Sequence, residues 1–258
     1  MNKVALITGA SSGLGLALSQ RLAALDYDLI LVARSIDKLN QLKQALEIKH
    51  KITVNIIQQD LSAVDAAAKV FNFVKTQGLS VGLLVNNAGF GLHGLFQDLS
   101  LSEQLEMIQV NISTLTALSY LYLNHCQRKN GHVVNIASTA AFQPGPKMAV
   151  YYASKAYVLS FSEALAQELK TSKVFVTTIC PGPTKTGFQT RAALADVKWL
   201  TSDRLPSADD VARYIIKAIK KKKRLGIPGF SNKLLALFSK FLPRKVITQF
   251  VSKIQSNK

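Results

Sequence analysis

Two side chains that could exchange a proton with a substrate lie one helical turn apart. Tyr151 and Lys155 are separated by four positions, a spacing that places both side chains on the same face of a helix. A nearby ammonium favours the phenolate form and could lower the pKa of the tyrosine. Moving that pKa from about 10 to near 7 takes roughly 4 kcal/mol, which is large but attainable beside a cation and a bound group that is itself positively charged. Tyr151 is therefore a candidate general acid or base, whereas Tyr152 lacks this spacing and is expected to face elsewhere and pack.

Ser138 is the second candidate for chemistry. It follows the apolar run 133–136, and two prolines between it and Tyr151 predict a loop that separates a strand from a helix. Its hydroxyl could hydrogen-bond a substrate oxygen whose charge changes during a reaction. A tyrosine and a lysine at this spacing are most often an ordinary pair on a helix surface, so the catalytic interpretation depends on the other motifs of the chain.

A glycine-rich loop near the start of the chain could hold a phosphate. The apolar run 4–7 predicts a buried strand, and leucines at helical spacing from Leu14 predict a helix. Gly13 and Gly15 allow a tight turn, and the helix start presents unpaired N–H groups and a positive dipole end. The spacing differs from the commoner Gly-x-Gly-x-x-Gly, and a simple strand-to-helix turn is the alternative. The residues expected to hold a pyrophosphate are Gly9, Ser11, Ser12, Gly13, Leu14 and Gly15.

The ends of the following strands carry further candidate ligands for a dinucleotide. The second apolar run ends in Ala33 and Arg34. An acidic residue here would bond the ribose hydroxyls of NAD, whereas Arg34 can pair with a 2′-phosphate, which favours NADP. A solvated arginine at a strand end is the alternative. The residues at the ends of the third and fourth runs that could meet the adenine and the ribose are Asp60, Leu61, Asn87, Ala88 and Gly89; for the last three, simple turn chemistry is the alternative.

Apolar runs and helical patterns alternate along the chain that carries these residues. The runs predict strands at 4–7, 29–32, 52–57, 81–85, 133–136 and 174–179, and a last short strand at 225–227. Strands this apolar need cover on both faces, and strand–helix alternation implies right-handed parallel crossovers. The sequence therefore predicts an α/β fold with a doubly wound parallel sheet and ligand groups at the carboxyl ends of its strands.

Length and composition exclude several classes of protein. A chain of 258 residues can form one domain with a large core, and no apolar run is long enough to span a bilayer. A strand that begins by Val4 leaves no room for a signal peptide. Cys126 and Cys180 are far apart, which indicates a reducing, cytoplasmic compartment and packed thiols. The four histidines form no ligand cluster, so no metal is expected.

These motifs together resemble the short-chain dehydrogenase/reductase (SDR) family over most of the chain. The matching residues are Thr8-Gly9-x-x-x-Gly13-x-Gly15, Asn86-Asn87-Ala88-Gly89, Asn111, Ser138, Tyr151-x-x-x-Lys155 and Pro181-Gly182-x-x-x-Thr186. The resemblance implies a Rossmann-type fold and a catalytic group of Asn111, Ser138, Tyr151 and Lys155. It implies that Tyr151 handles a proton, that Lys155 lowers its pKa and holds the nicotinamide ribose, and that Asn111 anchors a water in a proton relay.

The resemblance also bears on the cofactor. The residues that it places around the nicotinamide are Pro181, Gly182, Thr184 and Thr186. Among family members, an arginine after a non-acidic residue looks like an NADP preference. Many NADP users have a basic residue before the second glycine, where this chain has Ser12. The loop then supplies no cation for the 2′-phosphate, which would be bound by Arg34 with help from Lys38. NAD stays an alternative.

The expected substrate is a small apolar carbonyl compound or alcohol. Residues 185–205 lie where family members carry a mobile flap over the substrate, and they include Phe188, Trp199 and Leu200. This stretch and the turn Phe90-Gly91-Leu92 suggest a hydrophobic ligand. The alternative is that Trp199 merely packs the flap on the core.

The C-terminal part of the chain is strongly basic. Residues 217–258 contain twelve Lys or Arg and no Asp or Glu, which accounts for most of the net charge of +17. Apolar residues recur at helical spacing before and after Pro243, which predicts two basic amphipathic helices. Such helices can lie on an anionic membrane surface, or they can cover the sheet or a partner subunit. Nucleic acid is not an expected partner, because stacking aromatics do not alternate with the cations.

The sequence thus predicts a catalytic domain over 1–229 and a basic helical tail over 230–258. The leading hypothesis is an NADP(H)-dependent oxidoreductase that interconverts a carbonyl and a secondary alcohol on an apolar substrate, with Tyr151 as general acid/base. It is expected in the cytoplasm, with the tail free to dock on a membrane, and as a homodimer or homotetramer, as the family resemblance implies. Two alternatives remain: a protein that binds NADPH as a signal without turnover, and a membrane-docked scaffold.

Overall fold

The computed structural model describes residues 3–125, 130–192 and 205–256. Its centre is one parallel sheet of seven strands in the order β3-β2-β1-β4-β5-β6-β7. The strands are β1 (Val4–Thr8), β2 (Asp28–Ala33), β3 (Val54–Gln58), β4 (Leu83–Asn86), β5 (Gly131–Ile136), β6 (Val174–Ile179) and β7 (Leu225–Gly226). The strand order reverses between β1 and β4, which is the place where open parallel sheets bind ligands. The predicted doubly wound sheet is confirmed.

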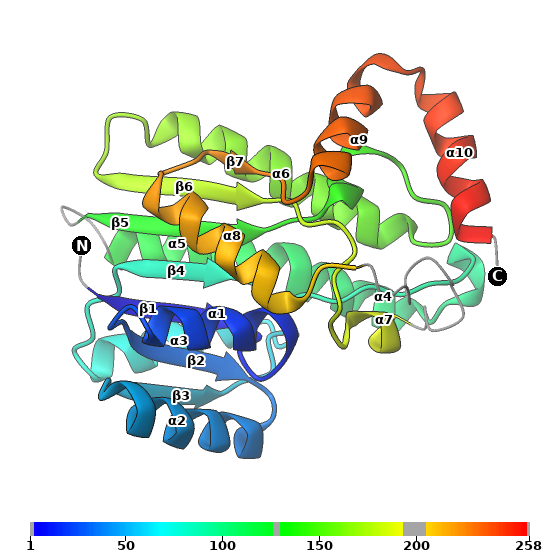
Figure 1. Ribbon diagram of the computed structural model, residues 1–258. Helices are drawn as coiled ribbons and strands as arrows, with labels where there is room; N and C mark the ends of the chain where they lie inside the picture. Colours follow the sequence, from blue (N-terminus) through cyan, green and yellow to red (C-terminus); the bar gives the residue numbers. More distant parts are fainter. Residues whose placement is uncertain (1–2, 126–129, 193–204, 257–258) are drawn as a thin grey trace.

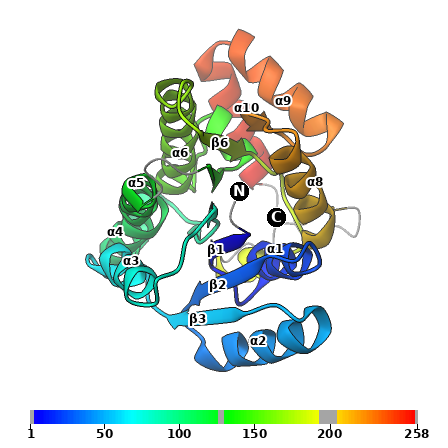
Figure 2. The same ribbon diagram turned by 90° about the vertical axis from the view of Figure 1, so that its left-hand side faces the viewer.

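Helices cover both faces of this sheet, as Figures 1 and 2 show. One face is covered by α1 (Gly13–Ala23), α2 (Ile36–His50) and α8 (Ala208–Lys220). The other is covered by α3 (Ala66–Thr76), α5 (Leu115–His125) and α6 (Ala149–Glu168). The alternating strands and helices give this arrangement because each parallel crossover returns over a face of the sheet.

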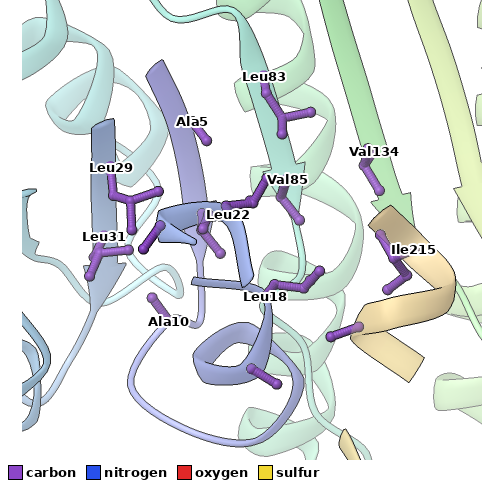
Figure 3. Close-up of a cluster of buried hydrophobic side chains, with 14 of the residues drawn as sticks. Ala5, Ala10, Leu18, Leu22, Leu29, Leu31, Leu83, Val85, Val134 and Ile215 are labelled. Atoms are coloured by element: carbon purple, nitrogen blue, oxygen red, sulfur yellow. The ribbon is translucent and has the colours of Figure 1, made fainter. Parts of the chain in front are cut away.

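Successive side chains of a strand point to opposite faces of the sheet and belong to two separate hydrophobic cores. Ala5 and Ile7 of β1 belong to the cluster under α1 and α8, whereas Leu6 belongs to the cluster under α3 and α5. The first cluster includes Leu18 and Leu22 of α1, and Figure 3 shows them against the strands. Burial on both faces explains why these strands are apolar without interruption.

The helical segment between β4 and β5 is divided into three parts. It consists of α4 (Leu101–Ile108), the π-helical turn η2 (Gln109–Thr114) and α5. A π-turn adds a residue to a helical turn and is common at functional sites. The consequence is that Asn111 lies at an irregular point of the helix, where its side chain turns inward and is buried.

Short helical elements follow the carboxyl ends of two strands. They are η3 (Thr139–Phe142), which follows β5, and α7 (Phe188–Arg191), which follows β6. Another short turn, η1 (Phe96–Asp98), precedes α4. The predicted flap residues Trp199 and Leu200, and Cys126, lie outside the described residues.

The predicted basic tail forms two helices, α9 (Phe230–Phe241) and α10 (Arg244–Ser256), with Pro243 between them. Both lie beyond the carboxyl ends of β5 and β6, orange and red in Figure 1. Part of each helix packs on the protein, because Ala236, Ile247 and Val251 are buried. Among the described helices, none is long and apolar enough to cross a bilayer.

Candidate active site

The glycine-rich loop after β1 forms a compact turn into α1. Gly9 and Gly13 have φ values of +67° and +51°, a backbone region that side chains disfavour. A Cβ on Gly15 would collide with the carbonyl oxygen of Gly9, and at 2.7 Å with Nδ2 of Asn87. The third glycine is therefore needed for close packing, and Gly13 begins the helix whose free N–H groups face the loop.

Hydrogen bonds tie this loop to the end of β4. Nδ2 of Asn87 donates to the carbonyl oxygen of Thr8 at 2.8 Å, and the backbone N–H groups of Asn87 and Ala88 both donate to Oγ1 of Thr8 at 3.0 Å. The segments that end the two central strands are thereby held as one rigid unit on both sides of the point where the strand order reverses.

The ends of β2 and β3 lie on the same side of the sheet. Arg34 is exposed and, together with Lys38 at the start of α2, lines the cavity described below. The Asp60 carboxylate accepts from the backbone N–H and the hydroxyl of Ser62, at 2.9 and 2.8 Å. The carbonyl oxygen of Leu61 accepts from Oγ1 of Thr114 at 2.8 Å, which ties this strand end to η2.

Asn111 and Lys155 meet behind Gly89. Oδ1 of Asn111 accepts from the N–H of Phe90 at 3.1 Å, and its Nδ2 donates to the Phe90 carbonyl and to Oγ of Ser154, both at 3.0 Å. Nζ of Lys155 donates to the carbonyl oxygen of Ile136 at 3.0 Å. A Cβ on Gly89 would lie 2.9 Å from Oδ1 of Asn111 and 3.3 Å from Nζ of Lys155. The absence of a side chain on Gly89 therefore leaves room for both Asn111 and Lys155.

Tyr151 and Lys155 share one face of α6, as their spacing predicts, and both are buried. Nζ of Lys155 lies 5.8 Å from the centroid of the Tyr151 ring. Burial raises the pKa of Tyr151 far above its usual value, and a hydrogen bond with Ser138 opposes this only in part. Burial also lowers the pKa of Lys155 to about 8. The expectation that Lys155, together with a bound nicotinamide, brings the pKa of this phenol toward neutral values stays a prediction.

Ser138 lies where β5 passes into η3, and it accepts from the N–H of Ala140 at 3.1 Å. The neighbouring strand end is tied to it, because the N–H of Thr139 donates to the Pro181 carbonyl at 2.9 Å. Oγ1 of Thr184 donates to the Gly182 carbonyl at 2.9 Å, and Oγ1 of Thr186 accepts from the N–H of Phe188 at 3.2 Å. The loop after β6 is thus folded on itself beside Ser138.

One cavity of about 1080 Å³ joins these parts, more than the 300–1,000 Å³ usual for one small ligand. The predicted residues that line it are Gly9, Ser11, Ser12, Gly13, Leu14, Arg34, Asp60, Leu61, Asn87, Ala88, Gly89, Ser138, Tyr151, Lys155, Pro181, Gly182, Thr184 and Thr186. Gly15 and Asn111 are not in the lining and lie behind it. Cys180 is packed, as expected, and burial raises its pKa to about 12.

The sequence did not predict several of the residues that line the cavity. Tyr152 was expected to pack away from the site, but its ring lines the same cavity and lies 6.1 Å from that of Tyr151. The reason is that the end of α10 reaches this side chain, where Nε2 of Gln255 donates to the Tyr152 hydroxyl. The tail residues that line the cavity are Asn232, Leu235, Phe250, Val251, Ile254 and Gln255. The helical spacing of apolar residues in the tail indicated a buried stripe, but not what it would cover.

Comparisons with known proteins agree with this geometry. A family model described as short chain dehydrogenase matches residues 3–196. The 17-beta-hydroxysteroid dehydrogenase type 3 of Mus musculus is 31% identical over 225 residues, which are 85% of this chain and 70% of that protein. The very-long-chain 3-oxoacyl-CoA reductase of Mus musculus is 28% identical over 98% of this chain and 80% of its own length.

Among solved structures, a short-chain dehydrogenase from Sphingobium yanoikuyae in complex with NADPH superposes with a TM-score of 0.83. It is 29% identical and covers 92% of this chain and 93% of its own. With the sheet order, the glycine loop and the Tyr151–Lys155 pair already in place, these matches lead to one conclusion. The chain belongs to the short-chain dehydrogenase family.

Proposed function

We propose that this oxidoreductase reduces apolar ketones to secondary alcohols with NADPH, and that Tyr151 donates the proton. One observation carries the proposal. A single cavity is lined by a glycine loop of the type that binds phosphates and also by the buried Tyr151 phenol with Ser138 beside it. A dinucleotide and a substrate must occupy adjoining parts of one site for a hydride to pass between them.

The chain's own residues fit NADP(H). The first turn of α1 offers free N–H groups to a pyrophosphate, and the packing of Gly15 on Gly9 leaves room for it. Arg34 and Lys38 would hold a 2′-phosphate, because both line the cavity next to Ala33, a position where NAD enzymes need a carboxylate. When bound, the cofactor would supply the hydride.

Each residue of the catalytic group has a distinct task in this proposal. Because burial keeps Tyr151 a neutral phenol, it carries the proton that the reduced carbonyl oxygen takes up. Ser138 would hold the same oxygen through its hydroxyl. Lys155, held by the carbonyl of Ile136, supplies positive charge close to the phenolate left behind. Asn111 fixes the backbone of Phe90 and so the shape of the site next to Lys155.

The rate of reduction is expected to fall above about pH 8. Burial lowers the pKa of Lys155 to about 8, so its ammonium is present below that pH and lost above it. Loss of the cation removes the charge that stabilises the Tyr151 phenolate, so kcat/KM should be flat below pH 8 and decline above it. The measurement is the pH profile of kcat/KM for ketone reduction. With Lys155→Arg, which keeps its charge, the decline should move above pH 10; an unchanged profile would show that another group titrates.

The proposed substrate is an apolar ketone larger than the small carbonyl compound expected from the sequence, because the cavity measures about 1080 Å³. The substrate part of the cavity is lined by Phe90, Met148 and Phe188, and by Phe250 and Ile254 of the tail. The relatives named above act, by their names, on hydroxysteroids and on very-long-chain 3-oxoacyl-CoA, both largely apolar. The test is NADPH consumption by the purified protein with a panel of keto-steroids, long-chain 3-oxoacyl thioesters and small polar ketones. Activity confined to small polar ketones, or absent throughout while NADPH binds, would favour the rival function of a cofactor-dependent sensor.

We also propose that the outer side of α9 and α10 contacts anionic membranes. Eight large apolar side chains between residues 230 and 250 are exposed: Phe230, Leu234, Leu237, Phe238, Phe241, Leu242, Val246 and Phe250. No Asp or Glu occurs after Asp210, whereas cations recur through both helices. Exposed apolar groups combined with positive charge are the features that bind helices to an anionic bilayer surface. Phe250 also lines the cavity, so this surface borders the substrate site.

Sedimentation with vesicles rich in phosphatidylserine tests this surface. Replacing an exposed phenylalanine removes apolar surface that the bilayer would bury. Phe238→Ser with Phe241→Ser should therefore lower the bound fraction at least tenfold at limiting lipid. The matched control is Ile48→Ser with Val64→Ser, which removes two exposed apolar side chains elsewhere. Equal binding by the two double variants, or equal binding to neutral vesicles, would contradict the proposal.

A further inference from the structure

The last turn of α10 brings a buried amide into the cavity. Gln255 is only 6% exposed. Its Nε2 donates to the hydroxyl of Tyr152 at 2.8 Å, which fixes the amide and directs Oε1 elsewhere. Within the described residues Oε1 is buried and has no hydrogen-bond partner, although Gln255 lines the cavity. A buried acceptor without a donor is uncommon in folded proteins and calls for an explanation.

His93, which also lines the cavity, has a second buried polar atom without a partner among the described residues. Its Nε2 has no hydrogen-bond partner in the part of the chain that the structure describes. Burial and the positive charge of Lys147 lower the pKa of His93, and a hydrogen bond with the backbone of Gln255 opposes them. The ring is therefore neutral near pH 7 and lies next to Gln255. Two residues 162 positions apart are thus neighbours in the cavity lining, and within the described ranges each has one unsatisfied polar atom.

We propose that Gln255 and His93 form a polar subsite that binds a neutral hydrogen-bond donor, such as a hydroxyl group, on an otherwise apolar substrate. A hydroxyl carries one proton, which it can donate to Oε1 of Gln255 or to Nε2 of His93. An ammonium group is disfavoured here because Lys147 already places positive charge near His93. The inference deepens the proposed function, because it assumes that the substrate occupies this cavity, and it adds a specificity determinant in the tail.

Ligand binding to the cofactor-loaded protein tests the subsite without relying on turnover. The probes are an apolar keto-steroid and derivatives of it that carry one hydroxyl at different ring positions. Because the hydroxyl satisfies a buried acceptor, at least one derivative should bind wild-type protein roughly tenfold more tightly than the parent ketone. Gln255→Leu and Gln255→Met should remove this preference, so that the derivative and the parent bind alike.

Gln249→Leu is the matched control, because it makes the same change at an exposed position of α10 that does not line the cavity. It should keep the preference for the hydroxylated ligand. Thermal unfolding of each variant identifies any that does not fold, and Gln255→Met preserves the length of the side chain. No preference in wild-type protein, or a full preference in both Gln255 variants, would overturn the subsite. Turnover of the parent ketone is measured separately, so that a failure of the proposed reaction is distinguished from a failure of the subsite.

Discussion

Tyr151→Phe is expected to lower kcat for ketone reduction by about 10³-fold while the affinity for NADPH changes little. The substitution removes only the hydroxyl, and with it the proton that the substrate oxygen must receive, a contribution typical of general acid catalysis. The ring stays in place between its neighbours, since the Tyr151 and Phe188 ring centroids lie 5.2 Å apart. The measurements are steady-state kinetics with an apolar ketone and a separate titration of NADPH binding.

Tyr152→Phe is the control for this prediction. It removes the adjacent phenol, which also lines the cavity but hydrogen-bonds Gln255, whereas Tyr151 hydrogen-bonds Ser138. Its effect on kcat should stay below tenfold, because it breaks one neutral hydrogen bond. If Tyr152→Phe were the crippling change and Tyr151→Phe retained activity, the assignment of the proton donor would be wrong.

Arg34→Asp is expected to change the preference for NADPH over NADH by at least about 100-fold. The guanidinium would form charge-assisted hydrogen bonds with the 2′-phosphate, each contributing about 1.5–3 kcal/mol, and a carboxylate would instead repel the phosphate. The same carboxylate can bond the ribose hydroxyls of NADH. The measurement is the ratio of kcat/KM for the two cofactors.

Lys49→Asp serves as the matched control for this charge reversal. Lys49 is an exposed cation near the end of α2 and does not line the cavity. The ratio of kcat/KM for the two cofactors should be unchanged in this variant. A similar shift in both variants would mean that the overall charge of the protein, and not Arg34, determines the preference.

Much of the sheet was predictable because its strands are short apolar runs, which fit a buried strand better than any other element. The runs around Leu6, Leu31 and Val134 became central strands at the expected places. The boundaries shifted where a polar residue begins a strand, as at β2, which starts at Asp28 and not at Leu29. Apolar periodicity cannot resolve such ends, since the terminal residues of a strand are partly exposed.

Residue spacing predicted those parts of the site that lie within one element or at the end of a strand. Tyr151 and Lys155 needed only the helical repeat to share a face. The π-turn that places Asn111 depends on where its amide finds partners, at Phe90 and Ser154, which no local pattern reveals. Gln255 was beyond prediction for the same reason, because its partner Tyr152 is 103 positions away.

Transfer of deuterium tests the central claim most directly. NADPH deuterated at both positions of C4 is incubated with the protein and an apolar ketone, and the alcohol is analysed by mass spectrometry. The account predicts an alcohol with one deuterium on the carbinol carbon for wild-type protein, and about 10³-fold slower formation of it for Tyr151→Phe. An alcohol without deuterium, or equal rates for the two proteins, would contradict the account.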